Sequence, residues 1–246
     1  MARQKSLVDD YFSTIFELGL VNSKVNARRH LEDLFDGIEI EGKRMLDIGG
    51  GNGIYSYYAG SMGAREVVCL EPEAAGSHSG VTGTFGKIRS RLPEAKVTLD
   101  TRTVQEYPTD GEKFDIIFSH ASINHLDEDA CVTLLEDSDS WNSYKSIFTL
   151  VGGLANKGAR LVVVDCTRFN FFAFFGVKNP LCPTIEWFKH QKPEVWARLL
   201  EEAGFKNPKI RWEPIYRFGK PGKLLLGNAA AAYFLKSIFR LEMEKA

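Results

Sequence analysis

The chain has 246 residues, of which 44% are hydrophobic and 26% charged, a composition that fits one large α/β domain or two small ones. The 31 Lys and Arg residues against 32 Asp and Glu residues give a net charge of -1, with no basic run, so the overall charge does not favour a nucleic-acid partner. Neither a signal peptide nor an apolar stretch of about 18 residues is visible, so we expect a cytoplasmic protein without stable membrane insertion.

The first part of the chain predicts a helical cap over residues 1–38. Apolar residues repeat at helical spacing from residue 5 to residue 35, with a break at Gly19. Two interpretations stay open for this cap. It packs on a sheet as a structural layer, or it closes over a ligand as a lid that uses Tyr11 and Phe12.

The middle of the chain alternates short apolar runs with helical patterns. We expect strands at 44–48, 67–70, 96–99, 114–118 and 160–165, and helices at 53–62, 127–136 and 141–155. The Gly- and Ser-rich residues 73–91 predict a broken helix. Because most of these strands end on polar residues, the pattern predicts a doubly wound α/β fold with a site at the carboxyl edge of a mostly parallel sheet.

The last part of the chain predicts a helix at 193–203, a strand at 209–218, a helical stretch at 221–232 and a closing strand at 237–244. No repeat or linker is visible, so we expect a single domain over 1–246. Within it, 1–38 is the cap, 39–165 the cofactor-binding core, and 166–246 the substrate side with the C-terminal strands.

Cysteine and histidine spacings give no sign of a metal centre. The four cysteines, Cys69, Cys131, Cys166 and Cys182, form no C-x-x-C pair, and the five histidines show no metal-ligand spacing. We therefore expect free, mostly buried thiols in a reducing compartment and no bound metal.

The most informative stretch is Met45–Gly53, where a strand ends at Asp47 and opens into four glycines. A strand, a glycine turn and a helix form a nucleotide-type cofactor site, since glycine permits close backbone approach and the helix start offers free N–H groups. The dinucleotide pattern G-x-G-x-x-G fails in both registers, because Ile54 or Ser56 takes the place of the third glycine. The pattern that fits is acid-x-G-x-G-x-G, and a second acid, Glu71, ends the next strand.

With these residues the chain resembles the class I S-adenosylmethionine-dependent methyltransferases over about residues 40–165. The motifs that carry the resemblance are 46–53, Glu71-Pro72, Asp100 and the Phe-Asp-Ile-Ile-Phe strand at 114–118. The resemblance implies a seven-stranded, mostly parallel, Rossmann-like sheet whose last strand is antiparallel. It also implies an enzyme that uses S-adenosyl-L-methionine and releases S-adenosyl-L-homocysteine.

The resemblance also implies a set of cofactor-binding residues. They are Asp47, Gly49, Gly50, Gly51, Glu71, Pro72, Asp100, Thr101, Ser119 and His120. A carboxylate such as Glu71 can accept two hydrogen bonds from the ribose hydroxyls. Pro72 is expected against the adenine face, Asp100 and Thr101 at the adenine edge, and the last two residues on the methionine side. The alternatives are that Asp47 caps the loop backbone and that the later residues are plain turn or strand ends.

A methyl acceptor that must lose a proton calls for a general base, and histidine titrates near neutral pH. Three histidines follow the fourth and fifth predicted strands: His120, His125 and His190. We rank His190 and His120 above His125, which can cap a helix. A structural role is the alternative for each of the three.

The acceptor is expected to be a small molecule, most simply at a hydroxyl oxygen. Members of the family that methylate DNA amino groups carry Asn or Asp followed by Pro-Pro-aromatic after strand four, whereas this chain has Ser-His-Ala-Ser at 119–122. A protein side chain, a lipid-linked saccharide and a non-catalytic cofactor-binding scaffold remain alternatives. The sequence leaves the oligomeric state open.

Residues 169–175 hold five phenylalanines in seven positions. One interpretation is packing in a helix core or a lid. The other is an apolar wall for an apolar or aromatic substrate, or a contact with a lipid-linked one.

Overall fold

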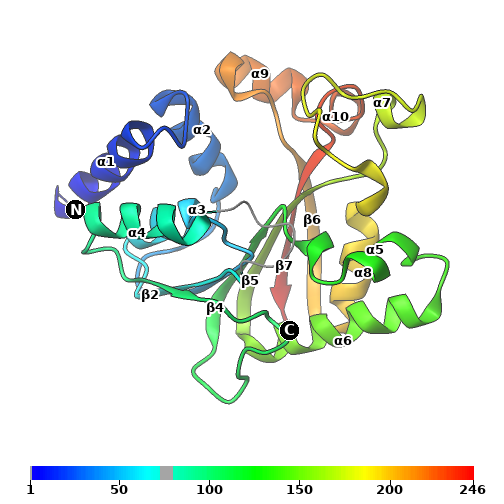
Figure 1. The fold of residues 1–246 in the computed structure, drawn as a ribbon, viewed down its shortest axis with the longest axis horizontal. Helices are drawn as coiled ribbons and strands as arrows, with labels where there is room; N and C mark the ends of the chain where they lie inside the picture. The colour runs from blue at the N-terminus through cyan, green and yellow to red at the C-terminus, as the bar shows by residue number, and fades with distance from the viewer. Residues whose placement is uncertain (1, 73–79) are drawn as a thin grey trace. The chain divides into compact units, whose positions relative to one another are not determined.

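A computed structural model describes residues 2–72 and 80–246 (Figure 1). The chain divides into two compact units, Met1–Ser119 and His120–Ala246, which are described separately. The strand order is β3-β2-β1-β4-β5-β7-β6, which gives the seven-stranded α/β fold expected from the sequence. No helix within the described ranges is both long enough and apolar enough to cross a bilayer.

The first unit contains a parallel sheet formed by β1 (Arg44–Ile48), β2 (Glu66–Leu70), β3 (Val97–Asp100) and β4 (Phe114–His120). All five residues of β1 are buried, because strands lie on both sides of it and helices cover the sheet. In this register the ends of β1 and β2 align, with Ile48 opposite Leu70. The residues that follow both strands therefore emerge at the same edge.

The helices of the first unit are α1 (Ala2–Glu17), α2 (Lys24–Leu34), α3 (Ile54–Ser61) and α4 (Val81–Arg91). Helix α1 packs on α2, α3 and α4, and its Tyr11 hydroxyl donates to the Ile54 carbonyl oxygen at 2.9 Å. Tyr11 and Phe12 are buried, so they act as packing residues of the cap. This geometry favours the structural layer over the lid.

The second unit is built on three antiparallel strands, in which β7 (Ile238–Lys245) lies between β5 (Ala155–Cys166) and β6 (Phe205–Trp212). Its helices are α5 (Glu128–Thr133), α6 (Ser138–Leu154), α7 (Phe171–Phe174), α8 (Pro193–Glu202), α9 (Gly219–Leu226) and α10 (Ala229–Phe234). Short 3₁₀ turns occur at Ile123–His125 (η1), Trp187–Lys189 (η2) and Tyr216–Phe218 (η3). The antiparallel last strand agrees with the expectation.

An aromatic cluster of Tyr144, Phe148 and Trp196 joins α6 to α8, with ring centroids 5.1 to 5.9 Å apart. The Tyr144 hydroxyl lies 3.1 Å from the carbonyl oxygens of Ile123 and Asn124. The segment after β4 is thereby held against α6. Burial of these rings supplies much of the apolar core of this unit.

Several sequence-based boundaries were wrong. The strand expected at 209–218 is Phe205–Trp212, which bulges between Lys206 and Lys209 and ends just before Pro214. The helix expected at 221–232 is two helices, because Asn228 caps the start of α10. The fifth strand begins at Ala155, five residues earlier than expected.

The broken helix expected at 73–91 is only partly within the described residues. Residues 73–79 lie outside them, and Val81–Arg91 is one continuous helix that includes Gly83 and Gly86. All four cysteines are free thiols, and three of them are buried, as expected.

Candidate active site

The glycine turn after β1 is fixed by backbone hydrogen bonds to the end of β2. The N–H groups of Gly49 and Gly50 both donate to the carbonyl oxygen of Leu70, at 2.9 and 3.0 Å. Gly49, Gly51 and Gly53 have φ values of 68°, 55° and 82°, in the left-handed region that glycine adopts without strain. The spacing seen in the sequence is therefore a requirement of this turn.

Gly50 is required for a different reason, which is close packing. A Cβ atom at this position would lie 2.8 Å from Asp47 Oδ2 and would also collide with the Cys69 sulfur. The turn therefore lies directly on the Asp47 carboxylate, and only glycine allows that contact.

Asp47 is fully buried at the base of the turn. Its Oδ2 accepts a hydrogen bond from the Ser56 hydroxyl at 2.6 Å, whereas Oδ1 has no hydrogen-bond partner among the described residues. Burial raises the pKa of Asp47 to about 7; the Ser56 hydrogen bond opposes this rise and the nearby Glu71 charge adds to it. A buried carboxylate with one unused oxygen suits a cationic ligand group.

Glu71 connects the end of β2 to the glycine turn. Its Oε2 accepts a hydrogen bond from the Gly51 N–H at 2.8 Å, and its own N–H donates to the Asp100 carbonyl oxygen at 2.9 Å. Glu71 is buried. The ends of β1, β2 and β3 therefore form one hydrogen-bonded edge, which brings together Asp47, the glycines and Glu71 as the sequence predicted.

The carboxylate of Asp100, at the end of β3, is hydrogen-bonded to Arg102. Its carboxylate accepts from the Arg102 backbone N–H at 3.0 Å and from Arg102 Nη2 at 2.6 Å. The Arg102 side chain, more than any other group, lowers the pKa of this carboxyl. Thr101 is exposed, Pro72 is half-buried, and Ser119 is buried opposite Ile48.

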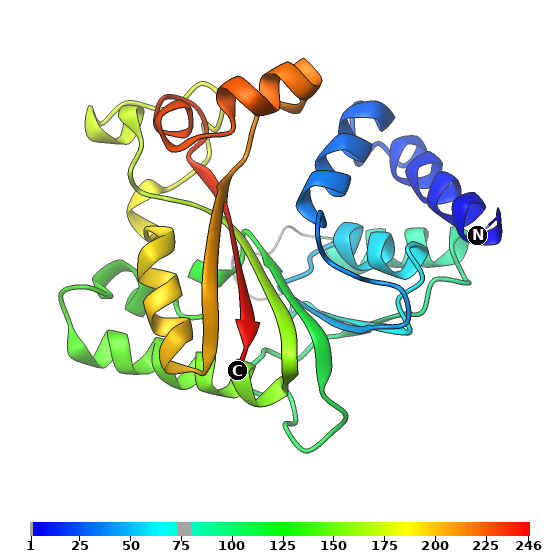
Figure 2. The ribbon, with the colours of Figure 1, turned by 180° about the vertical axis from the view of Figure 1, so that it is seen from behind.

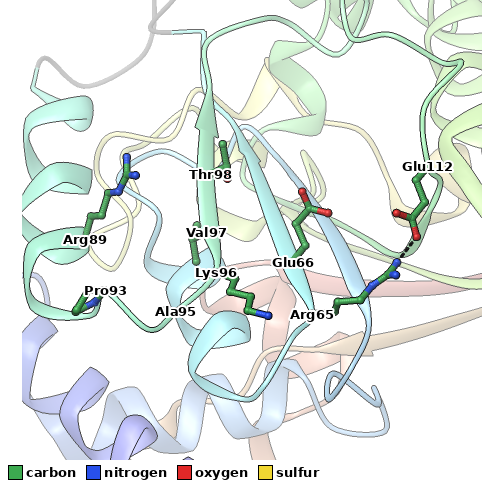
Figure 3. A pocket seen from close by; sticks show the side chains of 9 residues that line it. All are labelled: Arg65, Glu66, Arg89, Pro93, Ala95, Lys96, Val97, Thr98 and Glu112. Atoms are coloured by element: carbon green, nitrogen blue, oxygen red, sulfur yellow. Dashed lines mark hydrogen bonds and ion pairs between the residues drawn. The ribbon is translucent and has the colours of Figure 1, made fainter.

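A separate hollow of about 480 Å³ lies at the other end of the same strands (Figure 3). Its lining includes Arg65 and Glu66 at the start of β2 and Lys96 and Val97 at the start of β3. Figure 3 shows Arg65 turned toward Glu112, with which it forms an ion pair. In doubly wound folds ligands bind at the carboxyl ends of strands, so this hollow is not the cofactor site.

In the second unit, His190 is paired with an acid at the end of β5. His190 is nearly buried, and its Nδ1 lies 3.1 Å from Oδ1 of Asp165, which is 2% exposed. The same oxygen accepts from the Cys166 N–H at 2.7 Å, while Asp165 Oδ2 has no hydrogen-bond partner within the described ranges. Sequence reasoning missed Asp165 as a partner, although an acid at the end of an apolar strand was the available signal.

The backbone around His190 is fixed on several sides. Arg168 donates from Nε to the His190 carbonyl oxygen at 2.6 Å and from Nη2 to the Phe188 carbonyl oxygen at 3.0 Å. The Gln191 amide donates to the Cys131 carbonyl oxygen at 2.6 Å. The His190 ring is thus held rigidly beside Asp165.

The other two histidines differ from His190. His125 is half exposed and forms a surface ion pair with Glu128, which Lys189 also contacts at 3.0 Å. The His125 hydrogen bond is the main reason why the pKa of Glu128 is lowered. His120, the last residue of β4, is half-buried. The geometry therefore favours His190 among the three as a proton acceptor.

Comparisons with known proteins found one matching family and a set of solved structures of similar fold. Residues 46–136 match the family described as a methyltransferase domain. A search of curated proteins found no match.

Three of the solved structures that share the fold are the following. A SAM-dependent methyltransferase from Aquifex aeolicus is 16% identical, with a TM-score of 0.58 over 96% of this chain and 98% of that one. One from Mesorhizobium loti is 13% identical, with a TM-score of 0.59 over 89% and 98%. Magnesium protoporphyrin IX methyltransferase from Synechocystis PCC 6803, with bound SAH, is 14% identical, with a TM-score of 0.54 over 91% and 84%.

Over residues 46–136 this chain is similar to the methyltransferase domain family, and its fold is similar to that of SAM-dependent methyltransferases of known structure. The domain match covers residues 46–53, Glu71-Pro72, Asp100 and the strand at 114–118, which are the parts of the chain that carried the resemblance in the sequence.

Proposed function

We propose that this protein transfers the methyl group of S-adenosylmethionine to a hydroxyl oxygen of a small molecule. The observation that carries the cofactor assignment is the edge formed by the glycine turn, Glu71 and the buried Asp47, whose Oδ1 lacks a partner among the described residues. The observation that favours an oxygen acceptor is the buried pair of His190 and Asp165.

The residues of the first unit fit the cofactor's polar groups. Asp47 Oδ1 can accept a hydrogen bond from the cofactor's ammonium group, which offsets the cost of burying the carboxylate charge. Glu71, held by the Gly51 N–H, is oriented to accept from the ribose hydroxyls. Pro72, Asp100, Thr101, Ser119 and His120 remain predicted contacts.

The cofactor supplies an activated methyl group, so this chain has to orient the acceptor, exclude water and remove a proton. With Nδ1 donating to Asp165, Nε2 of His190 is the atom that accepts the proton. With the cofactor bound, its methyl group would pass from sulfur to the hydroxyl oxygen, and Nε2 of His190 would take the hydroxyl proton. The products would be a methyl ether and S-adenosylhomocysteine.

Calorimetry with S-adenosylmethionine tests the cofactor assignment, and absence of binding at millimolar ligand would overturn it. A labelled methyl donor then tests the acceptor with hydroxylated small molecules, amines, peptides and lipid-linked saccharides as separate groups. Label in the hydroxylated group supports the proposal. Label only in another group keeps the cofactor assignment and overturns the acceptor.

A further inference from the structure

The exposed apolar residues of this protein are concentrated in one part of the chain. Thirteen large hydrophobic side chains of the described residues are exposed, and ten of them lie between Phe169 and Phe234. The other three, Phe16, Val25 and Leu135, lie elsewhere. Isolated exposed apolar residues are normal in a protein, but a concentration of them marks an interaction surface.

The topology of the second unit explains why these residues gather. Strands β5 and β6 run in the same direction, antiparallel to β7, so the segments after β5 and β6 and before β7 leave at one end. These segments form α7, η3, α9 and α10, and α10 contacts both α7 and α9. Figures 1 and 2 show α7, α9 and α10 together beyond that end of the strands.

Ring contacts join α7 to α10, and α9 packs on α10. Phe171 of α7 lies 5.3 Å from Phe234 of α10 and 5.0 Å from Phe175, between ring centroids. The most exposed members are Leu224 at 84% and Phe174 at 77%. We call this the α7–α10 surface and define it by Phe174, Phe175, Phe218, Leu224, Leu225 and Phe234. The packing interpretation of residues 169–175 is therefore wrong for Phe174 and Phe175.

The same segments carry an excess of positive charge, although the net charge of the whole chain is -1. Residues 215–236 contain Arg217, Lys220, Lys223 and Lys236 and no acidic residue. Residues 168–192 add Arg168, Lys178, Lys189 and Lys192 against a single acid, Glu186. The Lys192 ammonium lies 5.1 Å from the centroid of the Phe169 ring, so one of these cationic groups lies against an aromatic ring.

We propose that the α7–α10 surface docks on an anionic lipid bilayer, with its phenylalanine and leucine side chains in the interfacial layer and its lysines and arginines against the headgroups. Exposed aromatic and leucine residues beside basic ones are the composition of an interfacial membrane contact. The contact is peripheral. It is independent of the proposed methyl acceptor, because it rests only on the exposure and charge of these segments.

A second copy of this chain fits the surface less well. An isologous contact would bring the basic residues of the two copies, such as Arg217 and Lys220, near one another without acids to offset them. An anionic bilayer supplies the opposite charge and an apolar layer together. Each basic residue near such a surface is worth about a fivefold change in binding.

The test is co-sedimentation of the full chain with vesicles of phosphatidylcholine that contain phosphatidylglycerol, compared with vesicles of phosphatidylcholine alone. We expect binding to the anionic vesicles only, and weaker binding as salt is raised, since salt screens these charges. Equal binding to both vesicle types, or to neither, would overturn the proposal.

Two variants with matched controls separate the charge from the apolar contribution. Arg217→Glu with Lys220→Glu should reduce binding at least about 25-fold, from about fivefold for each lost charge. Lys206→Glu with Lys209→Glu, on exposed residues of β6, should change it little. Phe174→Ser with Leu224→Ser should abolish binding, whereas Val25→Ser with Leu135→Ser should not.

Calorimetry with S-adenosylmethionine on each variant checks that the cofactor-binding unit is intact. Loss of vesicle binding with retained cofactor binding supports the proposal. Sedimentation of the protein without vesicles measures whether it is a monomer or a dimer. A dimer that Phe174→Ser with Leu224→Ser dissociates would assign the surface to a second copy and overturn the lipid proposal.

Discussion

The two compact units each hold a buried aspartate near the carboxyl end of a strand, and their partners differ. Asp47 in the first unit receives a hydrogen bond from the Ser56 hydroxyl, and Asp165 in the second unit faces His190. In both, the second carboxylate oxygen has no hydrogen-bond partner within residues 2–72 and 80–246. A serine hydroxyl fixes a carboxylate without changing its charge, whereas an imidazole can exchange a proton. Similar burial therefore suits Asp47 to a cationic ligand and Asp165 to holding a histidine that can exchange a proton.

The largest expected effect is that of His190→Asn on turnover. Loss of a general base lowers kcat by about 10²–10⁴-fold, while cofactor affinity should stay within about twofold. Turnover with a labelled methyl donor and calorimetry measure the two quantities. His125→Asn is the comparison, because that residue lies in a surface ion pair, and its turnover should be nearly unchanged. Equal effects of both substitutions would remove the distinction between these histidines.

Asp47→Asn should weaken S-adenosylmethionine binding by about 10- to 100-fold, the contribution of one hydrogen bond to a charged group. The substitution keeps the shape of the side chain and removes a buried charge, so the free energy of unfolding at neutral pH should not fall. Calorimetry and denaturant unfolding test both statements. Unchanged cofactor affinity would mean that Asp47 only supports the turn.

Gly50→Ala should destabilise the fold by about 1–3 kcal/mol, because the added methyl group collides with the Cys69 sulfur and Asp47 Oδ2. Gly86→Ala in α4 is the matched control. A Cβ there meets nothing within 4 Å, and alanine in a helix is favoured over glycine by about 0.5–1 kcal/mol. Denaturant unfolding should therefore move in opposite directions for the two variants.

A further expected effect is a pH dependence of stability that comes from Asp47. Its pKa is about 7 in the folded protein and 3.8 in the reference state, so between these values the folded protein holds a proton that the unfolded chain has lost. The free energy of unfolding contributed by this group therefore falls as pH rises from about 4 to about 7. Denaturant unfolding of the cofactor-free protein across this range should show a steeper decline than that of Asp47→Asn.

Much of the first unit could be predicted from the sequence because its signals are local. Four short apolar runs with acids or small polar residues after them define parallel strands, and the glycine pattern defines the turn between β1 and α3. Contacts such as Gly51 with Glu71 follow once two parallel strands are in register. The C-terminal segments were harder to predict from the sequence. The bulge of β6 depends on strand pairing and the break between α9 and α10 on helix capping, and neither follows from the spacing of apolar residues.

By itself the sequence determined the edge formed by the glycine turn, Asp47 and Glu71, because the glycine spacing and the acids at the strand ends are local features of the sequence. Only the tertiary structure decided that His190 has a buried acidic partner, since Asp165 and His190 are 25 residues apart and meet through the packing of the segment after β5. The tertiary structure also decided which phenylalanines of residues 169–175 are exposed. Burial depends on which segments pack over a helix, and in the second unit the described residues leave Phe174 and Phe175 exposed.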